Sequence, residues 1–460
     1  MKSSDRINYA LGCVALALFT GCGALRQAQG DSALPQAQGD SALPQAQGDS
    51  ALPQAQGDSA LRQAQGDSGL RQPFDKLRVT SYRGTPAASY QLLYSFRPQK
   101  AGTHPVAGLL DVHGVLYGTT TQGGLGHGTV YRVTTSGKQK VVYRFRGGTD
   151  GQYPQSGLLN VNGTLYGTTS KGGTSNAGTV YSVTTSGTEN VLYSFKGGSD
   201  GYDPLAGLID VNGTLYGTTF QGGGSGCDSN LGCGTVFSVT TSGQENVLYR
   251  FSGGADGAGP RSVLIDVKGV LYGATELGAH CGTVFSITPG GAEKRLYAFK
   301  GGSDGCYPQS GLVNVNGMLY GTTSEGGQSG SDCGGPCGTV YRISRSGAEK
   351  VIYKFADGTD GAAPHAALTL VKGVLYGTTT GGGEGGQCFL INGNCGTVYS
   401  VTTAGVETVL YRFAGGTDGW YPVAGLANVG GTLYGTTYYG GYRDVCCHIY
   451  GYGTIFSVSP

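Results

Sequence analysis

The chain has 460 residues, and its 88 glycines and 16 prolines make more than a fifth of it unsuited to helix interiors. Charged residues amount to only 13% and the formal net charge is +1, which argues against nucleic acid as a partner. Thirty tyrosines beside two methionines and one tryptophan favour many short strands joined by tight turns.

Residues 1–21 have the features of an export signal. Lys2 and Arg6 precede an apolar run that is too short to span a bilayer. Phe19-Thr20-Gly21-Cys22 resembles a bacterial lipobox, so we expect Cys22 to be lipidated and to anchor the protein to a membrane. Cleavage after Ala24 is the alternative, and it would give a freely secreted protein. Both interpretations place the mature chain outside the cytoplasm.

Residues 22–89 are predicted to be a disordered tether. The hexapeptide Gln-Ala-Gln-Gly-Asp-Ser begins at Gln27 and recurs with a period of nine residues, at Gln36, Gln45, Gln54 and Gln63. One leucine per unit cannot bury a core. Prolines within the tract also exclude a continuous amphipathic helix.

Residues 90–460 contain one unit that recurs seven times. Leu-Tyr-Gly-(Thr/Ala)-Thr places its tyrosine at Tyr117, Tyr166, Tyr216, Tyr272, Tyr320, Tyr376 and Tyr434. Gly-Thr-(Val/Ile)-(Tyr/Phe) begins at Gly128, Gly178, Gly234, Gly282, Gly338, Gly396 and Gly453. Tyr-x-Phe begins at Tyr94, Tyr143, Tyr193, Tyr249, Tyr297, Tyr353 and Tyr411. Units of about fifty residues are typical of propellers and solenoids.

Each unit predicts four strands. In the third unit, strands are expected over 207–211, 214–219, 234–239 and 246–251, with the hairpin signal Asn212-Gly213 between the first two. The last unit ends without a fourth strand, whereas Leu92–Phe96 precedes the first complete unit. We therefore predict an all-β, seven-bladed β-propeller of four-stranded blades, in which the N-terminal strand completes the last blade.

Taken together, the three motifs resemble the GloVer tandem repeat of bacterial exported and surface proteins. The order Leu-Tyr-Gly-Thr-Thr-x-x-Gly-Gly, Gly-Thr-Val-Phe and Leu-Tyr-x-Phe-x-Gly-Gly-x-Asp-Gly extends over about residues 90–460. The resemblance implies export and surface attachment, and it brings no assigned activity. The strand order also resembles kelch propellers, although the kelch tryptophan is absent from the repeats.

One aspartate follows the Tyr-x-Phe strand in six units, at Asp150, Asp200, Asp256, Asp304, Asp360 and Asp418. Calcium loops cluster several oxygen ligands in one segment, whereas these loops have a single aspartate each. We interpret the aspartates as turn residues and expect neither a metal nor a cofactor.

The longer loops of a four-stranded meander open on one face, which we call the loop face. We predict ligand contacts there from Tyr153, Tyr202, Tyr307, Trp420, Tyr421, Tyr439 and Tyr442. The alternative is that these rings only cover the ends of the blades. Glu276, Glu325 and Glu384 lie on the same face, but their spacing assigns no acid and base roles.

The favoured function is a binding module for a glycan or protein at the cell surface, acting as a monomer. The rival hypotheses are an extracellular hydrolase or lyase acting on polysaccharide and a structural envelope protein.

Cysteines concentrate in the long loops between the second and third strands. We predict disulfides Cys227–Cys233, Cys333–Cys337 and Cys388–Cys395, whereas the pairing of the adjacent Cys446 and Cys447 stays open. Two lone cysteines, Cys281 and Cys306, fall in loops on the same face, which predicts a bridge from blade four to the crossover into blade five.

Overall fold

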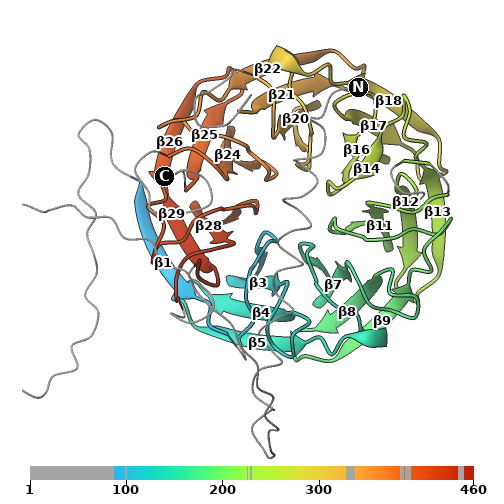
Figure 1. Ribbon diagram of the computed structural model, residues 1–460, viewed down its shortest axis with the longest axis horizontal. Coiled ribbons are helices and arrows are strands. Elements are labelled where there is room, and N and C mark those ends of the chain that lie inside the picture. Colours follow the sequence, from blue (N-terminus) through green and yellow to red (C-terminus); the bar gives the residue numbers. More distant parts are fainter. Residues whose placement is uncertain are drawn as a thin grey trace, which may run out of the picture. The chain divides into compact units, whose positions relative to one another are not determined.

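The computed structural model describes residues 88–98, 101–224, 226–227, 231–327, 337–383, 388, 395–443 and 450–460. The described residues form seven antiparallel blades arranged in a ring (Figure 1). In each blade a three-residue strand lies nearest the ring axis and the Tyr-x-Phe strand lies at the outer rim. The all-β, seven-bladed propeller predicted from the repeats is confirmed.

Within each blade the strands follow one another from the ring axis to the rim. Blade one comprises β2 (Leu110–Val112), β3 (Val115–Thr120), β4 (Thr129–Thr134) and β5 (Gln139–Arg144). Blade two comprises β6 (Leu159–Val161), β7 (Thr164–Thr169), β8 (Thr179–Thr184) and β9 (Glu189–Ser194). Blade three comprises β10 (Ile209–Val211), β11 (Thr214–Thr219), β12 (Thr235–Thr240) and β13 (Glu245–Arg250). Blade four comprises β15 (Ile265–Val267), β16 (Val270–Leu277), β17 (Thr283–Ile287) and β18 (Glu293–Ala298).

Blade five comprises β19 (Val313–Val315), β20 (Met318–Thr323), β21 (Thr339–Ser344) and β22 (Glu349–Lys354). Blade six comprises β23 (Thr369–Val371), β24 (Val374–Thr379), β25 (Thr397–Thr402) and β26 (Glu407–Arg412). Blade seven comprises β27 (Ala427–Val429), β28 (Thr432–Thr437), β29 (Thr454–Ser459) and β1 (Ser89–Ser95). Short 3-10 turns η1 (Gly148–Asp150) and η3 (Gly302–Asp304) lie in two crossovers.

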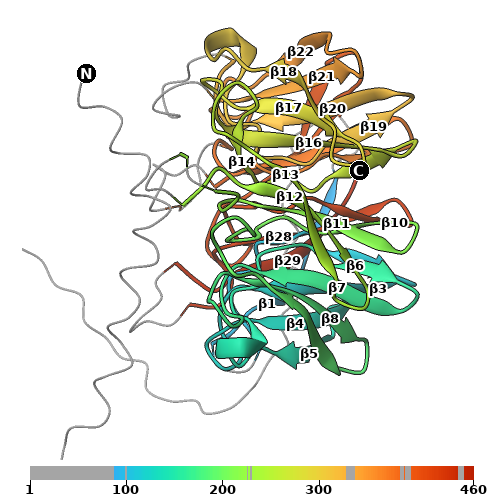
Figure 2. The same ribbon diagram turned by 90° about the vertical axis from the view of Figure 1, so that its right-hand side faces the viewer.

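Blade four has one additional strand, β14 (Ala258–Pro260), which pairs with an extended β16. In the other blades the equivalent contact is a single bridge, such as Tyr202 with Gln221. Figure 2 shows the ring from the side, with the strands stacked between two rows of connecting loops.

The last blade is closed by the N-terminal strand, as the sequence predicts. Strand β1 pairs antiparallel with β29, from Ser89 opposite Ser459 to Ser95 opposite Thr454 (Figure 1). It begins three residues earlier than Leu92, because Ser89 and Tyr90 still find partners on β29. A closed ring leaves no exposed edge between the first and last blades.

Neighbouring blades are joined by a repeated aromatic contact. The phenylalanine of each Tyr-x-Phe strand packs edge-to-face on the ring at the Gly-Thr-Val-(Tyr/Phe) position of the next blade, with centroids 5.0 Å apart for Phe145 and Tyr181. Both rings are fully buried.

Candidate functional site

Each crossover into a new blade contains a residue in the left-handed conformation that is followed by a proline. We call it the crossover residue. Its φ lies between 54° and 61° in all seven units, at His104, Tyr153, Asp203, Gly259, Tyr307, Ala363 and Tyr421. A bulky side chain is strained in this conformation, whereas glycine is not. Tyrosine at three of the seven positions is therefore an unusual choice, and such strain often marks ligand contacts.

The repeat brings most of the predicted aromatic residues to two adjacent positions on the loop face. Tyr153, Tyr307 and Tyr421 are crossover residues. Tyr202 and Trp420 stand one residue earlier, where each bridges to the residue that lies two positions past the end of the second strand. For Trp420 that partner is Tyr439.

Trp420 and Tyr442 differ in how far they are exposed. Trp420 is only 1% exposed, because its ring stacks on Tyr439 with centroids 4.4 Å apart and its indole N–H donates to the Tyr450 carbonyl. It therefore covers the end of a blade and offers no face to a ligand. Tyr442 is 41% exposed, and the Arg97 guanidinium lies 4.9 Å from its ring centroid.

A group of polar side chains gathers at and beside the crossovers between blades. We call it the axial cluster, and it comprises Lys171, Asp203, Arg261, Glu276, Gln309 and His365. Arg261, Gln309 and His365 directly follow the crossover prolines of blades four, five and six. The Gln309 amide donates to Glu276 Oε1 at 2.9 Å, and the His365 imidazole donates from Nδ1 to Gln309 Oε1. Arg261 Nη1 lies 3.6 Å from Glu276 Oε2.

The charge of Arg261 reaches groups from several blades. Burial lowers the pKa of His365 to about 4, and the nearby Arg261 contributes to this lowering, so the imidazole is neutral at pH 7. Burial raises the pKa of Asp203, against the lowering effects of Lys171 and Arg261. Burial also raises the pKa of Tyr421, again opposed by Arg261. The charge of Arg261 therefore acts on groups from blades three, six and seven.

Most of the axial cluster is absent from the sequence prediction. Its members are single polar residues in different repeats, and none belongs to the three motifs. One signal could have found them. The position after the crossover proline is Val106, Leu205 or Val423 in three units, but Gln155, Arg261, Gln309 or His365 in the other four. Since the fold tolerates an apolar residue at this position, polar residues there indicate a role other than folding.

The repeated aspartates stabilise the crossovers by hydrogen bonds. At six of the boundaries between neighbouring blades, which we call seams, the tyrosine of Tyr-x-Phe donates to the aspartate seven residues later, as Tyr193 does to Asp200 at 2.9 Å. The other Asp200 oxygen accepts the backbone N–H of Lys196 at 2.7 Å. These contacts are those of a turn residue, as predicted. Within the described residues no group of three potential metal ligands occurs.

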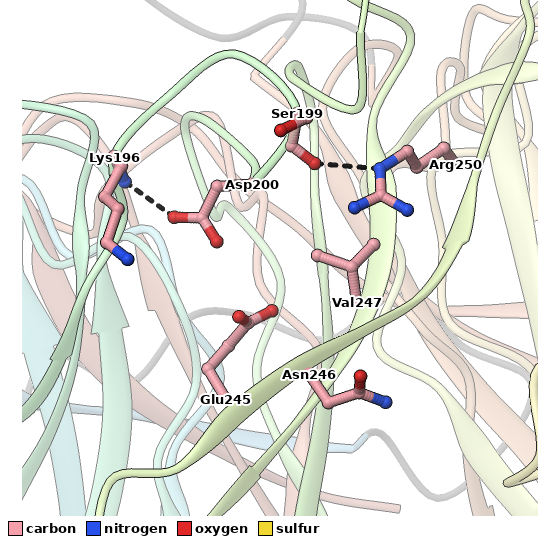
Figure 3. Close-up of a pocket in the computed structure, with 7 residues that line it drawn as sticks. All are labelled: Lys196, Ser199, Asp200, Glu245, Asn246, Val247 and Arg250. Atoms are coloured by element: carbon pink, nitrogen blue, oxygen red, sulfur yellow. Dashed lines mark hydrogen bonds between the residues drawn. The ribbon is translucent and has the colours of Figure 1, made fainter.

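A hollow lies near the rim, between the crossover that follows β9 of blade two and the outer strand β13 of blade three (Figure 3). Its volume is about 480 Å³, and it is lined by Lys196, Ser199, Asp200, Glu245, Asn246, Val247 and Arg250. Arg250 Nε donates to the Ser199 carbonyl at 2.9 Å across the seam. The Asp200 carboxylate holds the crossover turn, and the Glu245 carboxylate lies next to it. We therefore regard this hollow as part of the boundary between blades two and three.

Three of the four predicted disulfide bridges lie within the described residues. Cys227–Cys233, Cys281–Cys306 and Cys388–Cys395 are present, and the Cα atoms of Cys281 and Cys306 are 4.6 Å apart. The Cys281–Cys306 bridge ties the loop that follows Glu276 to the crossover that leads to Gln309. It therefore supports the hydrogen bond between these two members of the axial cluster.

Several predicted residues lie outside the described part of the chain. They are Cys22, Cys333, Glu384, Cys446 and Cys447. Cys337 is disulfide-bonded. Glu325 is described, its backbone bridges to that of Cys306, and burial raises the pKa of its carboxyl. The described residues include no helix that is long and apolar enough to cross a membrane.

Solved structures with a similar arrangement have low sequence identity. A prolyl endopeptidase is 14% identical with a TM-score of 0.42, over 74% of this chain and 47% of that one, so the chain spans about half its length. An aldose sugar dehydrogenase from Streptomyces coelicolor is 15% identical with a TM-score of 0.41, over 82% and 99%. The Trypanosoma rangeli sialidase is 12% identical with a TM-score of 0.41, over 81% and 59%. Likeness at this level gives no argument about activity.

The sequence of the repeat is more informative. A search of curated proteins gave no match. A family model described as the Gloeobacter/Verrucomicrobia repeat matches residues 78–231, 225–391 and 338–460, which together include all seven blades. The chain therefore belongs to the Gloeobacter/Verrucomicrobia repeat family.

Proposed function

We propose that this protein is an exported binding module, tethered to the cell envelope, that binds a glycan at the axial cluster. The main support is the convergence of polar side chains from several blades around Arg261, whose side chain is 43% exposed. Donors and acceptors that are held close together suit sugar hydroxyls, because each hydroxyl both donates and accepts a hydrogen bond.

Export is supported by two independent features. Residues 1–21 have the pattern of a signal peptide, and Cys22 stands where a lipid would be attached. The disulfide bridges on the loop face are of a kind that persists in oxidising compartments. On this proposal the lipid holds the chain on the membrane, and the residues between Cys22 and β1 separate the propeller from it. The propeller acts as a monomer.

The cluster favours a glycan over a protein as the ligand. Protein interfaces have an apolar, aromatic-rich core, whereas the axial cluster is polar and is bordered by the half-buried ring of Tyr421. Side chains of this kind, with one aromatic face beside them, are suited to a sugar ring.

A glycan array tests this proposal. We expect the purified chain to bind at least one immobilised glycan, and the Arg261→Gln variant to lose at least tenfold in affinity for it. Thermal melting of both proteins serves as the control for folding. Failure to bind any glycan would overturn the proposed function. Equal binding by both proteins would show that the axial cluster is not the site.

An extracellular hydrolase acting on polysaccharide is the second candidate. One observation favours it: Asp203 and Glu276 are two carboxyls of one cluster in different environments, with burial raising the pKa of Asp203. If this candidate is correct, reducing-end release from a polysaccharide that the array identifies will be lost in Glu276→Gln. Release that continues unchanged in this variant would rule out a catalytic role for Glu276.

A further inference from the structure

The chain has 30 basic and 29 acidic residues, yet the described part contains two ion pairs, and both lie in the axial cluster. Lys171 Nζ lies 3.8 Å from Asp203 Oδ1, and Arg261 Nη1 lies 3.6 Å from Glu276 Oε2. Both separations exceed the length of a hydrogen bond. The partners are therefore held near one another by charge, and part of their hydrogen-bonding capacity is unused.

Each ion pair has one member that can still form hydrogen bonds to a ligand: Arg261 as a donor and Asp203 as an acceptor. Arg261 has five N–H donors on a planar group and is 43% exposed, so several of them face solvent. Asp203 is an acceptor with a 20% exposed side chain, and the charge of Arg261 acts on it. Glu276 is different: its Oε2 is buried and accepts no hydrogen bond within the described residues, while Oε1 is taken by Gln309. Glu276 therefore faces Arg261 from the buried side and holds the guanidinium in place.

The formal charges of the cluster cancel. Lys171 and Arg261 supply two positive charges, Asp203 and Glu276 supply two negative charges, and His365 is neutral at pH 7. A ligand with a carboxylate or sulfate would approach Arg261 beside two carboxylates. A ligand with an ammonium group would approach Asp203 beside two cations. Either charged ligand would therefore be repelled by two groups of its own sign. The site is partly shielded from water, which makes this repulsion stronger.

We propose that the axial cluster selects an uncharged saccharide, with Arg261 donating to one hydroxyl and Asp203 accepting from a neighbouring hydroxyl of the same sugar. Glu276 acts as a positioning residue for Arg261. This inference rests on the proposed function, because it specifies which glycans the site takes.

Matched pairs of polymers test the inference with the full-length protein. The pairs are galactan with polygalacturonate, cellulose with carboxymethylcellulose, and chitin with chitosan. In each pair that binds, we expect the neutral polymer to bind at least tenfold more tightly than its charged counterpart. Tighter binding of a charged member that depends on Arg261 would overturn this inference and leave glycan binding intact. Absence of binding to all six polymers and to every glycan of the array would overturn the proposed function itself.

Charge-changing variants separate a positioning role from a purely structural one. Glu276→Gln leaves the cluster with a formal charge of +1, so we expect weaker binding of the neutral polymer and a shift in preference toward its acidic counterpart. Glu325→Gln is the matched control, since Glu325 is a partly buried glutamate of the loop face outside the cluster, and it should change neither affinity nor preference. A Glu276→Gln variant that loses affinity without any change in preference would contradict the charge-balance argument.

Discussion

At the residue scale, four tyrosine hydroxyls are buried without a hydrogen-bond partner among the described residues. They belong to Tyr131, Tyr181, Tyr341 and Tyr399, which occupy the same position in four blades. In the other three blades this position is Phe237, Phe285 or Phe456. Burial raises the pKa of Tyr181 far above its ordinary value, because the hydroxyl lies in apolar surroundings. Because phenylalanine serves equally well at this position, the fold requires the aromatic ring and not the hydroxyl.

The glycine of Leu-Tyr-Gly makes room for this ring. A Cβ on Gly167 would lie 2.6 Å from the hydroxyl oxygen of Tyr181, its cross-strand partner. The same glycine faces Phe237 in blade three, where a Cβ on Gly217 would lie 2.7 Å from the ring. The invariant glycine and the aromatic ring opposite it are therefore one packing unit, repeated in each blade.

We predict that Tyr181→Phe raises thermal stability. Removing a buried hydroxyl that has no partner recovers about 1 kcal/mol, the low end of the desolvation penalty for such a group. Differential scanning calorimetry of the variant and the parent protein measures the shift in Tm, which we expect to be upward by about 2 °C. Phe237→Tyr in blade three is the reverse control and should lower the Tm. A fall in Tm for Tyr181→Phe would mean that the hydroxyl has a partner, such as a bound water.

At the element scale, five seams between blades place a glutamate of one outer strand next to the crossover aspartate of the preceding blade. Glu189, Glu245, Glu293, Glu349 and Glu407 occupy this position. Burial, followed by the charge of Asp200, raises the pKa of Glu245 to about 7. Where the crossover lacks an aspartate, before blade one, the equivalent residue is Gln139. In blade seven it is Tyr90, whose hydroxyl donates to the Asp418 carbonyl.

We predict that Glu245 contributes more to the stability of the propeller near pH 5 than near pH 8. Between pH 4.5, the ordinary pKa of a glutamate, and about 7, its pKa in this seam, folded Glu245 binds more protons than the unfolded chain does. The free energy of unfolding therefore falls as the pH rises through this window. Solvent screening of this half-buried group limits the effect to about 1 kcal/mol.

Glu245→Gln tests this pH dependence directly. It should raise the Tm at pH 8 by about 2 °C and leave the Tm at pH 5 nearly unchanged. Asp200→Asn supplies the matched background, because it removes the repelling charge and leaves the burial of Glu245 in place. In this background Glu245→Gln should raise the Tm at pH 8 by a smaller amount, which measures the share due to burial. A Tm gain of the same size at both pH values would show that ionisation of Glu245 is not the cause.

At the scale of the whole molecule, the ring was predictable because each unit repeats three motifs in fixed order. The missing fourth strand of the last unit and the surplus strand before the first unit indicate closure, and β1 pairs with β29 accordingly. The exact register of the outer strands was not predictable. The pairing of β13 with β12 shifts at a β-bulge between Val236 and Phe237, and the apolar pattern of the sequence does not reveal this shift.

The candidate site was only partly predictable, for a related reason. Repeat motifs mark what every blade needs, whereas the axial cluster uses the positions at which blades differ. Tyr421 was predicted, since it is an aromatic residue on a loop. Arg261 and Gln309 were not, because their proximity depends on the ring geometry that brings blades four and five together with blades three and six. Trp420 was predicted to contact a ligand, with covering of the blade ends as the alternative. Its burial against Tyr439 favours the alternative, and this stacking has no sequence signal.

Closure by β1 gives the last prediction. The ring of Tyr90 stacks on Tyr411 with centroids 4.0 Å apart, and its hydroxyl donates to the Asp418 carbonyl at 2.7 Å, so β1 joins blades six and seven. A chain that begins at Arg97 lacks β1 and exposes the edge of β29, which is an aggregation hazard. We expect it to be mostly insoluble, whereas a chain that begins at Ala88 should melt like the full-length protein.

The substitution Tyr90→Ala tests the same contact without removing the strand. It deletes the stacking and the hydrogen bond, and we expect it to lower the Tm by several degrees, in line with the loss of about 3 kcal/mol for removing a large aromatic side chain. Leu92→Ala is the matched control, because Leu92 lies on the same strand and is 38% exposed, so its removal should change the Tm little. Equal solubility and melting of the chains that begin at Arg97 and Ala88 would refute closure by β1. In that event the last blade would be stable with three strands, and the loss from Tyr90→Ala would also disappear.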